Sequence, residues 1–368
     1  MLTQLGDITI AEFLSDYWQK KPLLVRQAFP QYQSPVSPDE LAGLSLEHAL
    51  ESRLIIEDTN TNTWQLEHGP LDENRFSSLP SSHWTLLVQG VDALDPEVNQ
   101  LLNEFRFMPN WRLDDIMVSY ASDQGSVGPH FDYYDVFLIQ TYGRRTWKLG
   151  QWCDGDSELI DNCDLAILKN FEQTHEWVLE PGDMLYVPPR LAHWGIALGE
   201  SMNFSVGFRA PKTSELLSHF CDYVLQNIND DSHYVDPQLA PTDKPGLIES
   251  GTLNGIKQMM MAAINNANIQ QWFGEFATQP RYPIAADDSI DTFSADDEFI
   301  QVEGARYAYS ESQDSALLFV NGETWTTSLG FAQQLCDAGA IKTLGLNDVD
   351  RDVLEDLQSK YLIQLSNV

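Results

Sequence analysis

The chain has 368 residues, of which 43% are hydrophobic and 11% aromatic, a composition typical of folded rather than disordered proteins. With 21 basic against 55 acidic residues its formal net charge is −34, which disfavours nucleic acid and anionic membranes as partners and favours a basic protein. No apolar run approaches the roughly 20 residues that span a bilayer, and MLTQLGDITIAEF has neither a basic start nor an apolar signal core. We therefore expect a cytoplasmic protein of two or three domains.

The first predicted elements are short helices and strands. Apolar residues at helical spacing begin at Ile10 and stop at Lys21-Pro22, where proline lacks the amide hydrogen that a helix needs. An extended LLV run follows. Ser37, with a proline after it and Glu40 at the third helical position, predicts a capping box and a second helix. The β-rich runs at 84–92 and 112–122 predict two strands.

From about residue 115 to residue 210 the sequence predicts a series of short strands. Gly, Pro, Asp and Asn turns separate the runs IMVSYA, DVFLIQTY, RTWKLG, HEWVLE, DMLYVP and MNFSVGF. Such spacing is typical of an antiparallel sandwich or barrel. A parallel α/β sheet is disfavoured, because no crossover helices lie between the strands.

Beyond Pro211 the apolar period becomes that of helices. SELLSHFCDYVLQNI, a region around Leu253 to Ile264 and IQQWFGEFAT together predict a helical module. An acidic stretch at 287–298 marks the next boundary. The remaining residues mix short strands, such as ALLFVNGETW, with the helical patterns FAQQLCDAG and NDVDRDVLEDLQSKYLIQL, the first of which ends in a glycine suited to capping a helix.

The segment SVGPHFDYYD carries a candidate metal site. In a strand, His130 and Asp132 would point to the same face, so that an imidazole nitrogen and a carboxylate oxygen share one space. The candidate third ligand is His193 in PPRLAHWG. Two histidines and one carboxylate form the facial triad of non-haem Fe(II) oxygenases, whereas three histidines would suggest a zinc hydrolase. The four cysteines include no CxxC pair, so no thiolate site is indicated.

Three further residues suggest a site for 2-oxoglutarate. In TYGRRTWKLG, strand alternation places Arg145 on one face and Arg144 on the opposite, solvent-facing side. A planar guanidinium can bind the distal carboxylate of this co-substrate through two hydrogen bonds. Asn203 and Ser205, on one face of SMNFSVGF, can hydrogen-bond the same molecule.

The segments HFDYYDVFLIQTYGRRTWKLG, PGDMLYVPPRLAHWGIALGESMNFSVGFRAP and FLSDYWQKKPLLVR resemble the JmjC-type cupin oxygenases. Among these the chain is most similar to the bacterial ribosomal oxygenases, which hydroxylate an arginine of a large-subunit ribosomal protein. The resemblance implies an α+β protein whose catalytic domain at 1–212 is a double-stranded β-helix, that is, a cupin or jelly roll. It also implies a helical dimerisation module at 213–285 and a winged-helix-like domain at 286–368, where the match is by size and pattern only.

By this resemblance His130, Asp132 and His193 ligate Fe(II), and no catalytic residue beyond the ligands is expected. Arg145 would hold the distal carboxylate of 2-oxoglutarate, and O2 would be the second co-substrate.

Two residues match the substrate pocket of the family. Asp123 stands just ahead of the His-x-Asp segment and Tyr142 on the following strand. An acid suits a substrate guanidinium, which stays charged and needs a counter-charge in a cleft. The alternative for Asp123 is a loop residue that caps a turn.

The resemblance implies hydroxylation of an arginine β-carbon in a basic ribosomal protein by a homodimer. A histidyl hydroxylase or lysine demethylase on the same scaffold is the first alternative, and a non-catalytic cupin that binds basic ribosomal proteins is the second. NDVDRDVLEDL is acidic where a DNA-reading helix would be basic, so we expect no direct contact with nucleic acid.

Overall fold

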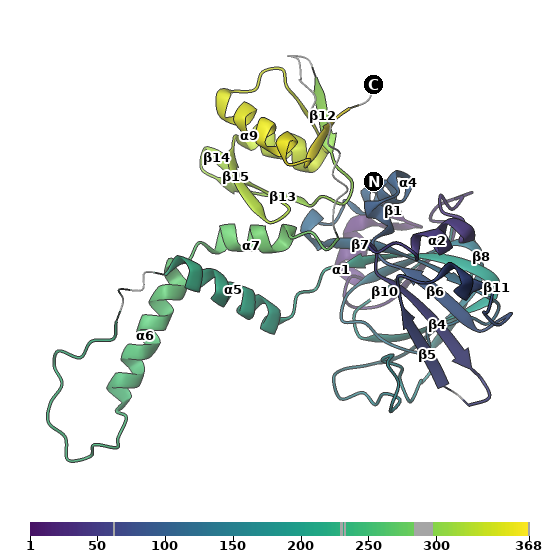
Figure 1. The fold of residues 1–368 in the computed structure, drawn as a ribbon, viewed down its shortest axis with the longest axis horizontal. Helices are drawn as coiled ribbons and strands as arrows, with labels where there is room; N and C mark the ends of the chain where they lie inside the picture. Colours follow the sequence, from purple (N-terminus) through teal and green to yellow (C-terminus); the bar gives the residue numbers. More distant parts are fainter. Residues whose placement is uncertain (62, 229–230, 232, 283–296, 367–368) are drawn as a thin grey trace.

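The computed structural model describes residues 1–61, 63–228, 231, 233–282 and 297–366. Figure 1 shows a β-rich body, a helical arm that projects away from it and a smaller C-terminal lobe next to α7. Among the described residues, no helix has both the length and the apolar composition that crossing a bilayer requires. The boundary predicted at 285/286, with most of the acidic stretch that marks it, lies outside the described residues.

The N-terminal elements form largely as the sequence predicts. The backbone N–H of Glu40 donates to the side-chain oxygen of Ser37, and the backbone N–H of Ser37 donates to the carboxylate of Glu40, so the predicted capping box is confirmed. The first helix ends at Asp16, earlier than predicted, because Gln19 adopts a positive φ of 57° and donates its backbone N–H to the hydroxyl of Tyr186. The bounds are β1 Gln4–Leu5, β2 Ile8–Thr9, α1 Ile10–Asp16, β3 Leu23–Val25 and α2 Pro38–Leu44.

The next elements complete one side of the body. They are β4 Ser52–Asp58, β5 Thr63–His68, α3 Glu73–Phe76, β6 Trp84–Val88, α4 Pro96–Leu102 and β7 Leu113–Ala121. The strand predicted at 112–122 is confirmed as β7, and the one predicted at 84–92 is confirmed as β6 except that it ends at Val88. The main sheet has the order β3-β10-β8-β11-β7-β6-β4-β5, with β9 paired to β8, and these neighbouring strands are antiparallel, as predicted. Its remaining strands are β8 Val136–Trp152, β9 His175–Leu179, β10 Met184–Val187 and β11 Leu191–Phe208.

Two strands of this sheet are longer than the sequence suggested. DVFLIQTY and RTWKLG are not separate strands but one bent strand, β8, and MNFSVGF is the second half of β11. The bend in β8 falls at Gly143, where φ is +62° and an added Cβ would lie 1.9 Å from the carbonyl oxygen of Glu200. Its pairing with β11 shifts register between Leu198 and Ser201. Glycine therefore bends the strand here instead of ending it.

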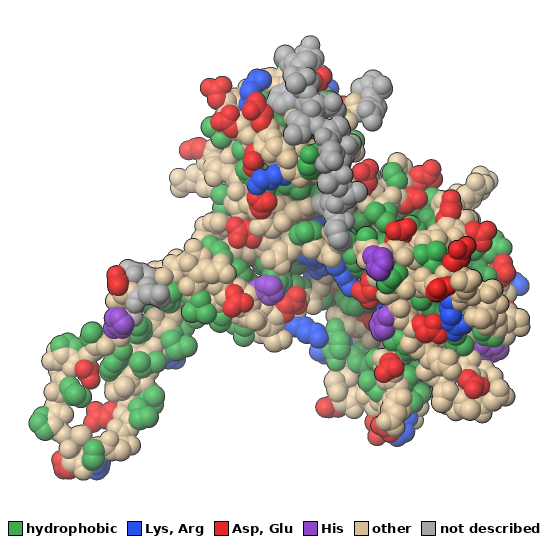
Figure 2. All heavy atoms as spheres, in the orientation of Figure 1, with side chains coloured by type: hydrophobic (Ala, Val, Ile, Leu, Met, Phe, Trp, Pro, Cys, Tyr) green, Lys and Arg blue, Asp and Glu red, His purple; other side chains and the backbone are tan. Residues whose placement is uncertain are grey.

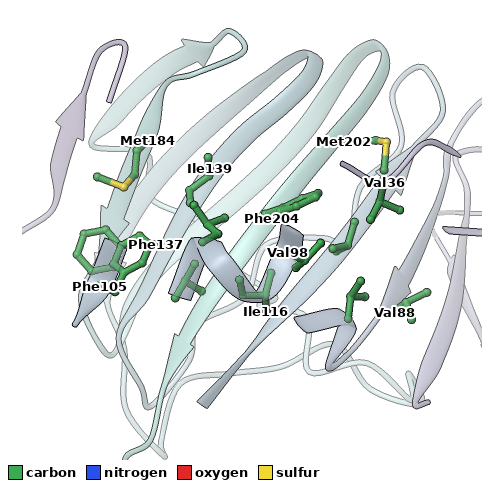
Figure 3. Packing of buried hydrophobic residues seen from close by; sticks show 14 of the residues in the cluster. Val36, Val88, Val98, Phe105, Ile116, Phe137, Ile139, Met184, Met202 and Phe204 are labelled. Atoms are coloured by element: carbon green, nitrogen blue, oxygen red, sulfur yellow. The ribbon is translucent and has the colours of Figure 1, made fainter. Parts of the chain in front are cut away.

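Alternation along β8 separates two apolar clusters. Phe137 and Ile139 pack into the larger core with Phe13 of α1 and Val98 of α4, and Figure 3 shows Phe137, Ile139, Val98 and Phe105 together over the sheet. Val136, Leu138, Trp147 and Leu149 form a second cluster on the other face. The two faces of the strand are thus buried against different partners, which fixes its register.

Residues after Pro211 form the arm and the lobe. The three helices predicted between 214 and 278 are α5 Thr213–Asn227, α6 Ser250–Asn266 and α7 Ile269–Thr278. No residue of α5 or α6 is buried, whereas α7 buries Trp272 and packs its Gly274 against the ring of Phe319 in the lobe. Hydrophobic side chains are prominent over the arm in Figure 2, while Asp and Glu are scattered over the visible face of the body and lobe.

The C-terminal lobe combines strands and helices around its own core of Phe299, Leu335, Leu354 and other apolar residues. The predicted glycine cap is confirmed, since the helical turn after α8 ends at Gly339 with a φ of +76°. The bounds are β12 Glu298–Gln301, β13 Tyr307–Ser312, β14 Ser315–Val320, β15 Glu323–Thr327, α8 Leu329–Gln333, β16 Ala340–Lys342, α9 Asp348–Ser359 and β17 Ile363–Leu365.

Asp92, which accepts the backbone N–H of Ile116 at 2.7 Å, is buried between the main sheet and the lobe. Burial, with a smaller contribution from the neighbouring Asp115, raises the pKa of this carboxyl to about 7. Because the folded-state pKa lies above the ordinary value, the folded protein loses stability as pH rises from about 4 to about 7. Asp92→Asn keeps the acceptor and removes the charge.

We therefore predict that the stability of Asp92→Asn relative to the wild type increases between pH 4 and pH 8, by on the order of 4 kcal/mol. Thermal melting across this pH range, with Asp7→Asn as an exposed control, measures the difference. A difference that does not change with pH would contradict the titration of Asp92.

Candidate metal centre and co-substrate cavity

Three side chains from separate parts of the chain converge on one point. His193 lies near the start of β11, and His130 and Asp132 lie in the segment between β7 and β8. One ligand atom from each of the three lies within 4.8 Å of the others, and Nε2 of His193 is 3.6 Å from Oδ2 of Asp132. These separations suit one divalent ion bound by all three side chains.

The backbone around His130 is not the strand that the sequence predicted. His130 and His193 form an isolated antiparallel bridge in which each backbone N–H donates to the carbonyl of the other, at 3.1 and 2.8 Å. Asp132 lies outside any strand, and its carbonyl accepts the N–H of Arg190 at 2.6 Å. Glycine and proline at 128–129 break the strand. The side chains therefore converge because of the bridge to β11, and not because of strand alternation.

Both imidazoles are oriented by backbone carbonyls. Nδ1 of His130 is 2.9 Å from the carbonyl oxygen of Gly128, and Nδ1 of His193 is 3.0 Å from that of Leu191. A carbonyl can only accept, so each Nδ1 carries the proton and each Nε2 keeps its lone pair for a metal. Burial, with a smaller contribution from His130, lowers the pKa of His193 to about 4, so this imidazole is neutral near pH 7.

Arg145 is a buried cation that forms no ion pair with any of the described residues. Its guanidinium donates to the hydroxyls of Ser119 and Ser201, both at 3.2 Å, and to the carbonyl of Ser201 at 3.4 Å. Burial lowers its pKa to about 10, so the group stays protonated at neutral pH. Arg144 is exposed, which confirms the predicted alternation. A buried, unpaired guanidinium is costly without a counter-ion, so the site is suited to an anion.

Asn203 and Ser205, on β11, line the same cavity as this guanidinium. The amide of Asn203 donates to the hydroxyl of Ser205 at 3.2 Å, while its buried Oδ1 has no hydrogen-bond partner within the part of the chain that the structure describes. An unsatisfied buried amide next to a lone cation is expected where a polar ligand binds.

All six of these residues line one cavity of about 380 Å³, a size within the usual range for small-molecule sites. Apolar side chains, including Val136, Leu138 and Trp147, form part of its wall, and a polar end contains Arg53, Gln89, Asp115 and Arg281. Sequence reasoning missed Ser119 and Ser201, which hold Arg145, although strand alternation along 113–121 would have placed Ser119 on the inner face.

Asp123 and Tyr142 are not among the residues that line the cavity. Asp123 is exposed and accepts the backbone N–H of Gly199 at 2.8 Å, the capping role that the sequence left open. Tyr142 is 45% exposed on β8. Both lie close to the bend shared by β8 and β11, and Gly125, two positions after Asp123, does line the cavity. Their substrate-binding roles remain predictions.

Comparison with known proteins gives matches along most of the chain. A JmjC domain model matches residues 100–216, and a ROXA-like winged helix model matches residues 258–362. The ribosomal protein uL16 3-hydroxylase of Escherichia coli is 38% identical over 325 residues, which are 83% of this chain and 85% of that protein. A probable ribosomal oxygenase of Haemophilus influenzae is 42% identical over 57% of this chain and 52% of its own.

Solved structures give matches to the same family as the sequence comparisons. The Escherichia coli ribosomal oxygenase in complex with cobalt and 2-oxoglutarate superposes with a TM-score of 0.85 and 33% identity over 99% of both chains. These matches confirm the predicted α+β fold, with a JmjC cupin body and a winged-helix C-terminal domain. By contrast, a lysine-specific demethylase and histidyl-hydroxylase of Aedes aegypti is 29% identical over 50% of this chain and 30% of its own.

We predict that the wild type binds one Co(II) ion and that His193→Ala weakens this binding on the order of 100-fold, because two remaining ligands hold a divalent ion poorly. Isothermal titration calorimetry measures the affinity, with the exposed His175→Ala as a matched control. Unchanged Co(II) affinity in His193→Ala would place the ion elsewhere.

Proposed function

The chain belongs to the JmjC-domain ribosomal oxygenases, and on that premise we propose that it is an Fe(II)- and 2-oxoglutarate-dependent hydroxylase of an arginine β-carbon in a large-subunit ribosomal protein. The observation that carries this proposal is the cavity in which a two-histidine, one-carboxylate cluster and an unpaired guanidinium face the same space. The donor set is that of non-haem Fe(II) oxygenases, and the guanidinium suits a dicarboxylate co-substrate.

Each part of the cavity has a distinct task in this proposal. When bound, Fe(II) and 2-oxoglutarate activate O2, so that one oxygen atom enters a substrate C–H bond and the other leaves in succinate as CO2 is lost. Arg145 binds the distal carboxylate, and each charge-assisted hydrogen bond contributes about 1.5 to 3 kcal/mol. Ser119 and Ser201 keep the guanidinium in place before the co-substrate arrives. Val136 and Trp147 exclude water from the cavity.

The charge of the protein supports a basic substrate. A net charge of −34 attracts a basic ribosomal protein and steers its approach. Asp123 and Tyr142 are the proposed contacts for the arginine side chain at the entrance near Gly125. Such a substrate also implies a cytoplasmic location.

The arm supports the proposal that the protein is a homodimer. Its helices expose apolar side chains that a monomer would leave in water, namely Leu217, Leu225, Leu253, Ile256, Met260 and Ile264. In Figure 1 the arm extends away from the body, where a second copy can reach it. An arm that exposes this many apolar side chains is typical of a subunit interface.

The C-terminal domain is proposed to make no direct contact with nucleic acid. Its longest helix, α9, carries five acidic residues and the single basic residue Arg351 within Asp348–Ser359. DNA-reading helices are basic, because they must neutralise phosphates.

We predict that the wild type, supplied with Fe(II), 2-oxoglutarate and an arginine-containing peptide of a basic ribosomal protein, forms succinate and adds one oxygen atom to the arginine. Arg145→Ala should lower kcat/KM by about 100-fold or more, because it removes the partner of the distal carboxylate. Arg144→Ala, its exposed neighbour, is the control.

The products separate the alternatives. Mass spectrometry that finds the oxygen on histidine, or loss of a methyl group from lysine, would favour the other enzyme classes. Tight binding of the peptide without turnover would favour a non-catalytic cupin.

We predict that Ile256→Asp converts the protein from a dimer to a monomer, since a charge in an apolar interface is costly. Sedimentation equilibrium measures the mass, and Gln258→Asp, on the other side of α6, is the control. A wild type that sediments as a monomer would contradict the dimer.

A further inference from the structure

Asp114, at the start of β7, binds arginines from three separate parts of the chain. Its Oδ1 lies 3.3 Å from Nε of Arg209 at the end of the β-rich body and 3.1 Å from Nη2 of Arg306 in the C-terminal domain. Its Oδ2 lies 3.0 Å from Nη1 of Arg281, in the segment after α7. Arg209 and Arg306 are mostly buried, at 18% and 14% side-chain exposure, so solvent screens these pairs less than surface ones.

The same arginines also hold the backbone. Arg306 donates to the carbonyls of Leu113 and Asp114, at 3.0 and 2.7 Å. Arg209 donates to the carbonyls of Ala277 and Gln279 at the end of α7, at 2.7 and 3.0 Å. The first residues of β7 are therefore tied to the C-terminal domain and to the arm through geometry that only a multidentate guanidinium provides.

Asp115, the next residue, points into the cavity. It is 3% exposed, and its oxygens accept the amide of Gln89, at 3.0 and 2.9 Å, and the hydroxyl of Tyr282, at 3.0 Å. The ring of Tyr282 packs on Gly90, where an added Cβ would lie 2.5 Å from the ring. The segment that carries Arg281 and Tyr282 thus packs against the β-rich body.

These contacts lie at the end of the cavity away from Arg145. Asp115, Met117 and Ser119 alternate along the inner face of β7, and Ser119 is the residue that holds Arg145. Four residues of strand place Asp115 about 13 Å from Ser119. In the proposed function, the co-substrate extends from Arg145 to the metal ligands and the target arginine enters beside Gly125, so the end lined by Asp114, Asp115 and Arg281 is left for the rest of the substrate peptide.

We propose that Asp114, Asp115, Arg209, Arg281, Tyr282 and Arg306, which we call the Asp114 clasp, couple docking of the C-terminal domain to the shape of the substrate end of the cavity. This inference rests on the proposed function. The residues of the clasp are positioning residues, because they act through the start of β7 and not on the reacting atoms. Peptide binding depends on the clasp, whereas binding of 2-oxoglutarate at the Arg145 end does not.

The test compares Arg306→Ala and Arg306→Lys in the full-length protein. Arg351→Ala is the control, since Arg351 is an exposed arginine of the same domain. Three quantities are measured: the KM for a basic ribosomal peptide, the KM for 2-oxoglutarate, and hydrogen–deuterium exchange over residues 113–121. Fluorescence anisotropy of the labelled peptide gives its affinity without turnover.

Arg306→Ala should raise the peptide KM by about tenfold, leave the 2-oxoglutarate KM within about twofold, and speed exchange at the start of β7. Arg306→Lys keeps the charge but cannot reach all three oxygens at once, so it should raise the peptide KM by about threefold. This milder variant also keeps the test decisive if Arg306→Ala does not fold.

Two results would overturn the clasp. If Arg306→Ala leaves the peptide KM at the wild-type value while hydrogen–deuterium exchange at β7 increases, the cluster stabilises the structure without affecting peptide binding. Equal increases in both KM values would indicate general loosening. A wild type that forms no succinate refutes the proposed function instead, and the anisotropy and exchange measurements then decide on the clasp.

Discussion

The bend shared by β8 and β11 is the constraint on which the site depends. Because β11 continues from Leu191 to Phe208 through this bend, it carries His193 on one half and Ser201, Asn203 and Ser205 on the other. The bend requires Gly143, since any Cβ there would collide with the carbonyl of Glu200. A single folded strand pair therefore sets the spacing between the metal ligands and the anion site.

Arg145 sits at this bend and links stability to function. Among the described residues, two hydroxyls and one carbonyl are the only acceptors for this buried guanidinium, so without an anion it lowers the stability of the protein. An anion that enters the cavity relieves that cost, so the site is organised for a dicarboxylate before one binds. At the opposite end of the cavity, the arginines of the Asp114 clasp bind Asp114 and fix the start of β7.

Local patterns in the sequence predicted much of the fold and of the site. Strand alternation separated Arg145 from Arg144, and the two-residue spacing of His130 and Asp132 led to His193 as their partner. Turn signals misled where glycine bends a strand, as at Gly143, and strand alternation misled at 130–132, which proved to be a bridged loop. The contact of Arg306 with Asp114 spans 192 positions and depends on how domains dock, which no local pattern encodes.

The most direct test of the site is a crystal structure of the protein with cobalt(II) and 2-oxoglutarate. The account predicts the ion within bonding distance of His130, Asp132 and His193, and the distal carboxylate paired with the guanidinium of Arg145. An ion bound away from these three side chains, or a diacid that leaves Arg145 without a partner, would contradict it.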